Sequence, residues 1–396
     1  MRLRRTQQAA AAATAVVAAS LGVALPGAGA AGSPCFMSVS STPVAHRVYS
    51  TGVVFDEFKV KVTSGSGSQT ATVQRMVMPT GSKPKLVYKR IGVLDELRDQ
   101  VKAQAPRAVA AVNGDFFFEY RWYTGGSTIM ALGPSVSHGT VLRAEANPHP
   151  VVGVDSAGNP YADKLRVSGS VTTRSGTYPI TGVNWHTISD KGVVEFTRAW
   201  QGGTSFRRPV GAVEWVVKNN GTIADVRTGS TRGLAVARNT RVLAFGRSLA
   251  LQASRARVGD TAKLVVTQTT STGVPLTEAV GRGYREVEAA AVVVDCRAVP
   301  NDPRPRTTVG WERGHWATLT VPGTGYDSYG YRIGGLGITQ TANVARALGF
   351  RAAYSVDGGG SVTEYARRND GAWSRLDDLN SRWQRPIVNG LAFTAP

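Results

Sequence analysis

Alternating apolar and polar positions dominate the chain and predict many short β-strands. Across residues 48–78, β-branched and aromatic residues alternate with polar ones around a Gly/Ser turn at 64–68, which predicts a β-hairpin. Further β-like runs cover residues 151–154, 211–217, 264–267 and 289–295, and the final strand is expected within 387–393. Turn residues separate these runs, so we expect a mostly β protein.

Two segments carry helical spacing instead. Leu94, Leu97 and Val101 fall on one face of a predicted helix, and Pro106 follows its end. A second helix is predicted over residues 336–348, with Gly349 as the residue that ends it. The expected fold class is therefore α+β, with a β-rich mixed sheet core and a few packed helices.

Polar residues follow two predicted buried strands at the point where each strand ends. The apolar run 109–112 stops at Asn113, Gly114 and Asp115, and two phenylalanines come next. An Asx turn that satisfies local backbone groups would explain Asn113 and Asp115 equally well. A polar cluster at the tip of a buried strand is the competing interpretation.

The second strand end is the most informative stretch of the sequence. A strand predicted over 352–356 runs into Asp357, the glycines Gly358, Gly359 and Gly360, and Ser361. Three glycines let the backbone approach a ligand and present its N–H groups to an anion. Burial of Asp357 at a strand end would raise its pKa and suit it to acid catalysis. A flexible turn is the alternative.

Two arginines stand beside prolines ahead of predicted strands. Arg306 precedes a strand at 309–311, and Arg385 precedes the last strand. An arginine can hold a phosphate or carboxylate through two hydrogen bonds, and the neighbouring proline stiffens the chain. In a chain this rich in arginine, most of these side chains are expected to be solvated surface groups.

Several catalytic motifs are absent from the sequence. It contains no G-x-S-x-G, H-E-x-x-H, C-x-x-C or Walker pattern, and its five histidines lack metal-ligand spacing. A serine hydrolase, a zincin or a nucleotide-driven enzyme is therefore not expected. A divalent cation is possible but no ligand cluster requires it, so carboxylates would carry any acid/base chemistry.

The first thirty residues resemble a signal peptide. Basic residues precede an Ala-rich apolar run, and Ala28 and Ala30 give an A-x-A cleavage pattern. We expect ordinary secretion; a twin-arginine route through Arg4 and Arg5 is less favoured because the hydrophobic consensus after the pair is missing. No later stretch is apolar enough to predict a transmembrane helix.

Charge and cysteine content fit an exported protein. The formal net charge is +19, which favours anionic neighbours such as an acidic glycan or cell envelope. The basic residues are dispersed and lack a stacking-aromatic motif, so specific nucleic-acid binding is not expected. Cys35 and Cys296 are the only cysteines, and either pairing or two separate thiols is open.

Taken in order, these motifs resemble the phosphodiester glycosidase family, which includes the animal lysosomal uncovering enzyme and many bacterial secreted proteins. The resemblance spans roughly residues 105–393. It suggests a signal peptide at 1–30, a β-rich N-terminal segment at 31–104 and a catalytic domain at 105–396. The matching segments are 113–117, 182–184, 196–197, 203–204, 306–311, 357–361, Asn380 and 385–386.

The resemblance implies that a sugar is cleaved from a phosphodiester. Asp357 and Asp115 would form the acid/base pair, and Arg306 and Arg385 would hold the leaving phosphate. The substrate-binding residues would be Asn113, Asn184, His186, Gly358, Gly359, Gly360 and Ser361.

The chain departs from the family pattern where it has Gly281-Arg282-Gly283-Tyr284 and at the unusual Cys296, which leaves the substrate open. The alternatives are a glycosidase acting on a phosphate-free polysaccharide and a non-catalytic glycan-binding protein with the same fold.

Overall fold

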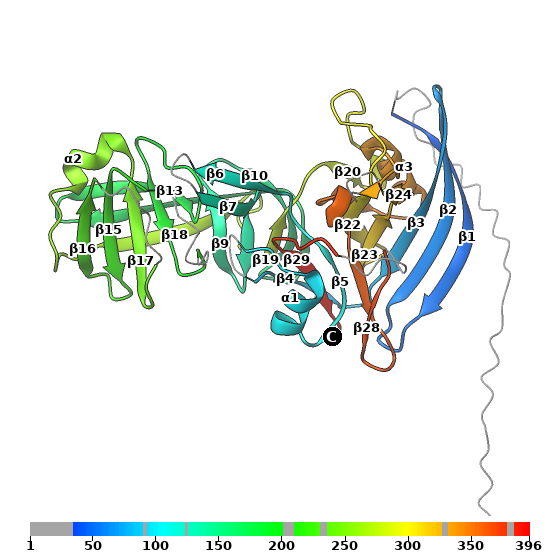
Figure 1. Cartoon of the computed structure of the whole chain (residues 1–396), viewed down its shortest axis with the longest axis horizontal. Helices are drawn as coiled ribbons and strands as arrows, with labels where there is room; N and C mark the ends of the chain where they lie inside the picture. The colour runs from blue at the N-terminus through cyan, green and yellow to red at the C-terminus, as the bar shows by residue number, and fades with distance from the viewer. Residues whose placement is uncertain are drawn as a thin grey trace, which may run out of the picture. The chain divides into compact units, whose positions relative to one another are not determined.

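Strands dominate the structure, a computed structural model that describes residues 35–89, 93–122, 126–200, 210–229, 236–326, 332–377 and 384–396. From Pro34 onward the chain forms one compact unit. Three α-helices occur in the described ranges: α1 (Leu97–Gln104), α2 (Ala250–Ala253) and α3 (Ile338–Ala347). The expected β-rich fold with few helices is confirmed (Figure 1). The predicted signal peptide lies outside the described residues.

One sheet has eight strands, all antiparallel to their neighbours, and contains the first three strands of the chain. Its order is β1-β2-β3-β23-β22-β26-β20-β21. The predicted hairpin is present as β2 and β3, joined at Ser64 and Gly67. The strands are β1 (Ser38–Val48), β2 (Val54–Ser64), β3 (Gly67–Val77), β20 (Arg285–Glu288), β21 (Ala291–Val292), β22 (Arg306–Glu312), β23 (His315–Val321) and β26 (Ala352–Ser355).

The strand expected over 289–295 is wrong in extent. Ala289 and Ala290 both have positive φ, at 48° and 63°, and form the turn between β20 and β21. Only Ala291 and Val292 extend as a strand. The apolar run is therefore mostly a turn and a loop, which periodicity alone cannot distinguish from a strand.

A five-stranded sheet packs against the eight-stranded sheet. Its order is β28-β27-β5-β29-β4, with β4 (Lys83–Val87), β5 (Ala108–Asn113), β27 (Glu364–Arg367), β28 (Trp373–Arg375) and β29 (Gly390–Thr394). Val112 and Leu391 face the core shared with Val309 and Trp316 of the larger sheet. Ala111 and Ala392 face α1, as the alternation of side chains along strands requires.

Helix α3 covers the other face of the eight-stranded sheet (Figure 1). Val344 and Ala345 pack on Val60, Val73 and Leu319. Gly349 has a φ of 99° and ends the helix, as the sequence predicts.

The remaining large sheet has twelve strands and contains one parallel pair, β13 with β14, which makes it mixed. Six of its strands, β9, β8, β19, β10, β12 and β13, pair in a closed ring. Closing a ring of strands removes free edges. The strands are β8 (Ser135–Ser137), β9 (Thr140–Glu145), β10 (His149–Asp155), β11 (Pro160–Tyr161), β12 (Lys164–Thr173), β13 (Gly176–Val183), β14 (Val193–Phe196), β15 (Val213–Lys218), β16 (Ile223–Thr228), β17 (Thr240–Phe245), β18 (Lys263–Thr270) and β19 (Leu276–Gly281).

Short elements complete the fold. Two hairpins are formed by β6 (Phe117–Trp122) with β7 (Gly126–Ala131) and by β24 (Gly325–Tyr326) with β25 (Arg332–Ile333). Two 3-10 helices are η1 (Arg247–Leu249) and η2 (Gly359–Ser361). Within the described ranges, no helix has the length and apolar character needed to span a membrane.

Strands from the predicted N-terminal segment, residues 31–104, pair with strands of the predicted catalytic domain in both the eight-stranded and the five-stranded sheet. β3 pairs with β23, and β4 pairs with β29. The predicted division at residues 104 and 105 stays a prediction.

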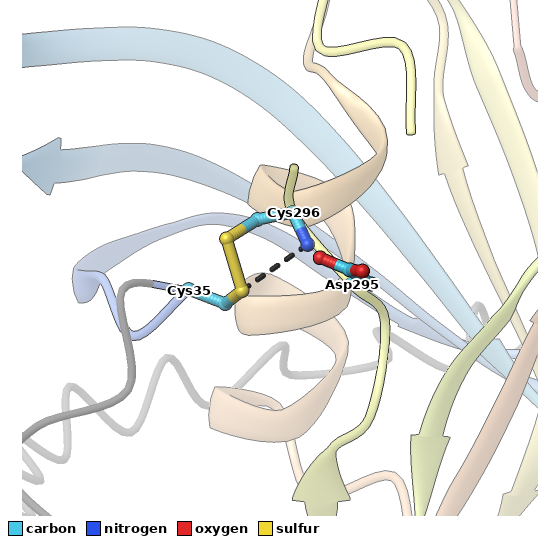
Figure 2. Close-up of side chains that lie close together, drawn as sticks. All are labelled: Cys35, Asp295 and Cys296. Atoms are coloured by element: carbon cyan, nitrogen blue, oxygen red, sulfur yellow. Dashed lines mark hydrogen bonds between the residues drawn. A yellow bond between two sulfur atoms is a disulfide. The ribbon is translucent and has the colours of Figure 1, made fainter. Parts of the chain in front are cut away.

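Cys35 and Cys296 are paired in a disulfide (Figure 2). The Cys296 N–H also donates to Cys35 Sγ at 3.1 Å. Asn343 of α3 donates to the Cys35 carbonyl and accepts from Met37 N–H, so the entry to β1 is fixed to the helix. The disulfide joins the start of β1 to the loop after β21.

Candidate functional site

The strand ends at residues 113–115 and 357–361, both of which contain glycine, are joined by hydrogen bonds. The Asp357 N–H donates to the Gly114 carbonyl at 2.8 Å, and Asn113 Nδ2 donates to the Asp357 carbonyl at 2.7 Å. Asp115 and Asp357 are thereby brought together from sequence positions far apart. The negative charge of Asp357 acts on Asp115 across this junction.

Asn113 is the centre of this junction. It has no exposed surface, and its Oδ1 accepts from the Thr307 hydroxyl at 2.8 Å and from the Thr363 N–H at 3.1 Å. Together with its bond to Asp357, these contacts tie the end of β5 to β22 and to the start of β27. Asn113 therefore supports the loops; its predicted contact with a sugar hydroxyl stays a prediction.

Asp115 is a buried carboxyl, only 3% exposed. Its Oδ2 accepts from the Gly133 N–H at 2.7 Å. Burial raises its pKa to about 7, against the opposing effects of that N–H and the Arg143 charge; the charge of Asp357 raises it further. Asp115 thus keeps its proton to a higher pH than an exposed aspartate does.

The lack of a side chain at Gly281 leaves the space that the Asp115 carboxyl occupies. A Cβ on Gly281 would lie 2.3 Å from Asp115 Oδ2, closer than any non-bonded contact permits. The position belongs to the Gly281-Arg282-Gly283-Tyr284 stretch that departs from the family pattern. The departure therefore adjoins the candidate site.

Asp357 is half-buried at the end of β26. Burial raises its pKa to about 6, while the Ser361 hydroxyl, the Gly358 N–H and the charge of Arg385 act to lower it. The Gly358 N–H donates to Asp357 Oδ1 at 2.8 Å. Both aspartates receive stabilising contacts, and the pKa of Asp115 is the higher because burial and the negative charge of Asp357 both raise it.

The triple-glycine segment is a fixed turn. A Cβ on Gly358 would approach the Pro305 carbonyl to 2.7 Å, and Gly359 has a φ of 59° and donates to that carbonyl at 2.9 Å. Gly359, Gly360 and Ser361 form η2. Close backbone approach and positive φ explain two of the three glycines.

The two predicted phosphate-binding arginines differ in their surroundings. Arg385 Nη1 donates to Ser361 Oγ at 3.5 Å, and its guanidinium lies 4.8 Å from the centre of the Phe117 ring. Arg306 flanks Gly358 through its backbone, but its side chain donates to the carbonyls of Leu336 and Asp302. Arg385 thus has the more direct link to Asp357.

Arg143 is a charged residue of this region that the sequence analysis missed. It is 1% exposed, donates to the Asn184 carbonyl at 2.9 Å and lies 4.1 Å from the centre of the Trp185 ring. Burial lowers its pKa to about 10, and the nearby carboxyls of Asp115 and Glu145 partly offset this effect. An arginine inside the apolar run of β9 was the signal that could have revealed it.

His186 lies against Arg143. Arg143 Nη2 lies 3.2 Å from His186 Nδ1, and because a guanidinium only donates, Nδ1 accepts and the ring proton is on Nε2. Burial and the charge of Arg143 lower the His186 pKa to about 4, with a further contribution from His149. His186 is therefore a neutral hydrogen-bond donor at neutral pH.

Asn184 is buried and holds the turn that presents His186. Its φ is 47°, its Nδ2 donates to the Leu142 carbonyl at 2.7 Å, and its Oδ1 accepts from the Thr197 N–H at 2.9 Å. Both ends of the Asn184 amide are hydrogen-bonded within the protein. Its predicted contact with a sugar stays a prediction. The other motif positions Gly203, Thr204 and Asn380 lie outside the described residues.

One group of potential metal ligands occurs in the described part of the chain: Cys35, Asp295 and Cys296. Both sulfur atoms are committed to the disulfide, as Figure 2 shows, so they do not form a thiolate site.

The C-terminal part of the chain matches the model of a known protein family. Residues 212–394 match the model of the phosphodiester glycosidase family. The match covers somewhat less than half of the chain. The matched segment contains Gly281, Arg306, Asp357 and Arg385, whereas Asp115 and Arg143 come from the chain before it. The site is therefore assembled from both parts.

Solved structures share the fold at low sequence identity. A hypothetical protein from Synechocystis is 16% identical with a TM-score of 0.66, over 91% of this chain and 68% of that one. A Burkholderia pseudomallei K96243 protein described as exported is 14% identical with a TM-score of 0.64, over 91% and 96%. No curated protein matches the sequence.

A zebrafish structure is a more distant match. It is the catalytic domain of N-acetylglucosamine-1-phosphodiester alpha-N-acetylglucosaminidase, auto-inhibited by its pro-peptide. It is 12% identical over 90% of this chain and 88% of that one, and its TM-score is 0.44.

Proposed function

We propose that the protein is a glycosidase that hydrolyses a glycosyl phosphodiester or a related acidic glycoside. The observation that carries this proposal is the hydrogen-bonded junction between Gly114 and Asp357, which brings Asp115 and Asp357, two carboxyls of raised and unequal pKa, within electrostatic range of each other. Paired carboxyls on either side of a glycosidic bond are the usual machinery of glycoside hydrolysis. The family match over residues 212–394 supports the same reaction type.

The unequal proton affinities suggest the roles of the two groups. Asp115, with the higher pKa, is the general acid that gives a proton to the leaving oxygen. Asp357, with the lower pKa, is ionised and either takes a proton from the attacking water or attacks the anomeric carbon. The glycosidic bond breaks, water supplies the hydroxyl of the freed sugar, and the leaving group departs as a phosphomonoester.

Arg385 is the favoured phosphate contact. It lies beside Ser361 and Asp357, and the guanidinium fork matches phosphate oxygens. Arg306 stays a predicted second phosphate contact, because only its backbone adjoins Gly358 and its guanidinium bonds to the Leu336 and Asp302 carbonyls. His186 stays a predicted substrate contact, linked to the site through its hydrogen bond with Arg143.

The dependence of hydrolysis on pH tests the acid/base pair. Asp357 must be ionised and Asp115 protonated, so kcat/KM should rise through a pKa near 6 and fall through a pKa near 7. Asp357→Asn should lower kcat by roughly 10²- to 10⁴-fold with the fold retained by circular dichroism, and Asp115→Asn should do the same with a glycoside whose leaving oxygen needs a proton. Full activity of either variant with such a glycoside would contradict the assignment.

The leaving group separates the phosphodiester from the phosphate-free alternative. A phosphomonoester has a second pKa of about 6 and leaves with little help, whereas a sugar alkoxide needs a proton. Asp115→Asn should therefore lower kcat far less with a glycosyl phosphodiester than with a neutral glycoside whose leaving group is a second sugar. If only phosphate-free glycosides react, the phosphodiester assignment is wrong; if none react, a glycan-binding role replaces catalysis.

We also propose that the protein is exported. The N-terminal pattern of residues 1–30 and the Cys35–Cys296 disulfide both suit an oxidising compartment. Expression with the native N-terminus, followed by mass determination of the protein in the medium or envelope fraction, tests cleavage after Ala30. Retention of the full-length chain in the cytoplasm would contradict export.

A further inference from the structure

The segment that joins β17 to β18 covers one side of a hydrophobic core in the twelve-stranded sheet. It spans residues 246–262 and contains η1, α2 and a short loop. Its inward side chains include Leu249, Ala253 and Ala256, which pack in the same core as Trp215. The Trp215 indole N–H also donates to the Ala253 carbonyl at 3.0 Å. The segment is therefore fixed to this core, and its exposed side chains point away from it.

Two apolar side chains of this segment are more exposed than any other large apolar side chain in the described ranges. Leu251 is 72% exposed and Val258 is 67% exposed. A single exposed apolar residue is ordinary on a protein surface. The two highest exposures fall on one short segment, which makes its outward side the best candidate in the described ranges for an apolar contact with another molecule.

Two exposed arginines lie between these apolar residues in the sequence. They are Arg255 and Arg257, and neither side chain forms an ion pair with a described residue. The carboxyl of the segment, Asp260, accepts from the Arg257 backbone N–H at 2.9 Å. Both guanidinium groups are therefore available to an anionic partner.

Basic residues of the adjoining turns extend this positive charge. The β15–β16 turn lies beside the end of the segment, because the Ala262 N–H donates to the Gly221 carbonyl at 2.8 Å. Lys218 immediately precedes this turn and is exposed. Lys263 begins β18 and is paired with β12 near the turn that carries Arg174. Three further exposed basic side chains thus lie close to the two arginines.

This combination of side chains fits the surface of a bilayer that contains anionic phospholipid. Arginine heads pair with lipid phosphates while their methylene stems lie along apolar surface. Exposed leucine and valine side chains gain free energy by entering the boundary between headgroups and acyl chains. A soluble polyanion would bind the arginines but leave Leu251 and Val258 in water. A lipid surface contacts both kinds of side chain.

We propose that a strip formed by Leu251, Arg255, Arg257 and Val258 docks the protein on an anionic lipid bilayer. The contact is reversible and sensitive to salt, since two apolar side chains bury little area and the remaining attraction is electrostatic. The strip contributes no residue to the candidate site. The inference therefore does not depend on the proposed glycosidase function.

Vesicle co-sedimentation tests the docking strip. The protein is residues 31–396, which lack the apolar N-terminal run and retain the compact unit. The probes are vesicles of phosphatidylcholine alone and vesicles in which about one third of the lipid is phosphatidylglycerol. The apolar variant is Leu251→Ser with Val258→Ser, and the charge variant is Arg255→Gln with Arg257→Gln.

Each variant has a matched control elsewhere on the surface. Val44→Ser with Val48→Ser removes two valines of β1 that are 57% and 61% exposed. Arg107→Gln with Arg351→Gln removes two exposed arginines, and therefore the same net charge as the charge variant. Circular dichroism and the thermal midpoint check that every variant keeps the fold.

We expect the unaltered chain to bind the anionic vesicles at least about tenfold more tightly than the phosphatidylcholine vesicles. The affinity for anionic vesicles should fall by roughly tenfold or more in the charge variant and by roughly fivefold or more in the apolar variant. Both controls should stay within about twofold of the unaltered chain. Hydrogen exchange should be slowed by anionic vesicles in peptides from the segment that carries the strip.

Two results would overturn the docking strip. The first is no binding of the unaltered chain to anionic vesicles, or an equal loss of affinity in a variant and its control. The second is retention on heparin that falls in the charge variant while the apolar variant binds vesicles like the unaltered chain. That second result would identify a soluble polyanion as the partner of the arginines.

Discussion

The two aspartates differ because of the atoms immediately around them. Each carboxyl has two hydrogen-bond donors and one arginine charge that lower its pKa: the Gly133 and Phe116 N–H groups with Arg143 at Asp115, and the Gly358 N–H and Ser361 hydroxyl with Arg385 at Asp357. Asp115 also feels the negative charge of Asp357, which adds to the effect of burial and raises its pKa further. Identical side chains thus acquire the different proton affinities that acid and base roles require.

Arg143 should set the alkaline limit of activity. Its positive charge lowers the pKa of Asp115, so Arg143→Met should raise that pKa above 7 and move the falling limb of the pH–rate profile to higher pH. The substitution also removes the charge that depresses the His186 pKa. The His186 pKa, followed by NMR of the imidazole protons, should rise from about 4.

Arg143→Lys is the control for this prediction. It keeps a positive charge, so the falling limb should stay closer to its original position than in Arg143→Met. A purely structural role would lower activity equally in both variants without moving the pH limits. That outcome would contradict an electrostatic role for Arg143.

At the scale of elements, the disulfide is the main covalent restraint. It closes a segment with a sequence separation of 261 between the start of β1 and the loop after β21. Restricting an unfolded chain over so long a loop is worth about 5 kcal/mol in the chain-entropy model, and removal of native disulfides costs about 2–5 kcal/mol.

The double variant Cys35→Ser, Cys296→Ser should therefore lower the free energy of unfolding by about 2–5 kcal/mol. Urea denaturation followed by tryptophan fluorescence measures the change. The unaltered protein with a reducing agent should approach the same stability, and the double variant should not respond to the reducing agent. A change below about 0.5 kcal/mol would show that the pairing of β1 with β2 and its contacts with α3 hold the strand without the disulfide.

Much of the element pattern follows from the sequence. The β2–β3 hairpin, α1, α3 and the strands that end at Asn113 and before Asp357 all occur where periodicity and turn residues place them. Periodicity failed at 289–295, where two alanines adopt positive φ. It also missed β1, because an exposed edge strand lacks the alternation that a buried face imposes.

The candidate site was predictable only in part. Residue types at strand ends indicated Asp115, Asp357 and Arg385 as neighbours, but nothing local reveals that Asn113 bonds to three separate segments. Arg143 and Gly281 enter through the pairing of distant strands. Such long-range contacts are set by the packed fold and leave only weak traces in local spacing.

At the scale of the whole molecule, two buried glutamates make stability depend on pH. Glu286 and Glu364 have no exposed surface, and burial raises the pKa of each to about 8 from 4.5. The folded state keeps protons that the unfolded chain releases between these values. Their contribution to stability is therefore complete below about pH 4.5 and is lost as pH rises through 8.

Glu364→Gln should flatten this dependence, because a neutral amide cannot ionise. Relative to the unaltered protein, the free energy of unfolding of the variant should increase between pH 5 and pH 9, by at most about 1.4 kcal/mol per pH unit within the window. Urea unfolding at pH 5, 7 and 9 measures it, with exposed Glu288→Gln as the control. A parallel shift at all three pH values would exclude ionisation of Glu364 as the cause.

The position of β29 has a consequence for how the molecule is made. This strand lies between β5 and β4 in the five-stranded sheet, yet it follows them by most of the chain. Asn389, immediately before it, accepts from the Asp115 N–H at 2.8 Å. Wherever the chain folds, β4 and β5 cannot complete their sheet until β29 is available to pair between them, so the acidic junction is among the last parts of the molecule that can assemble.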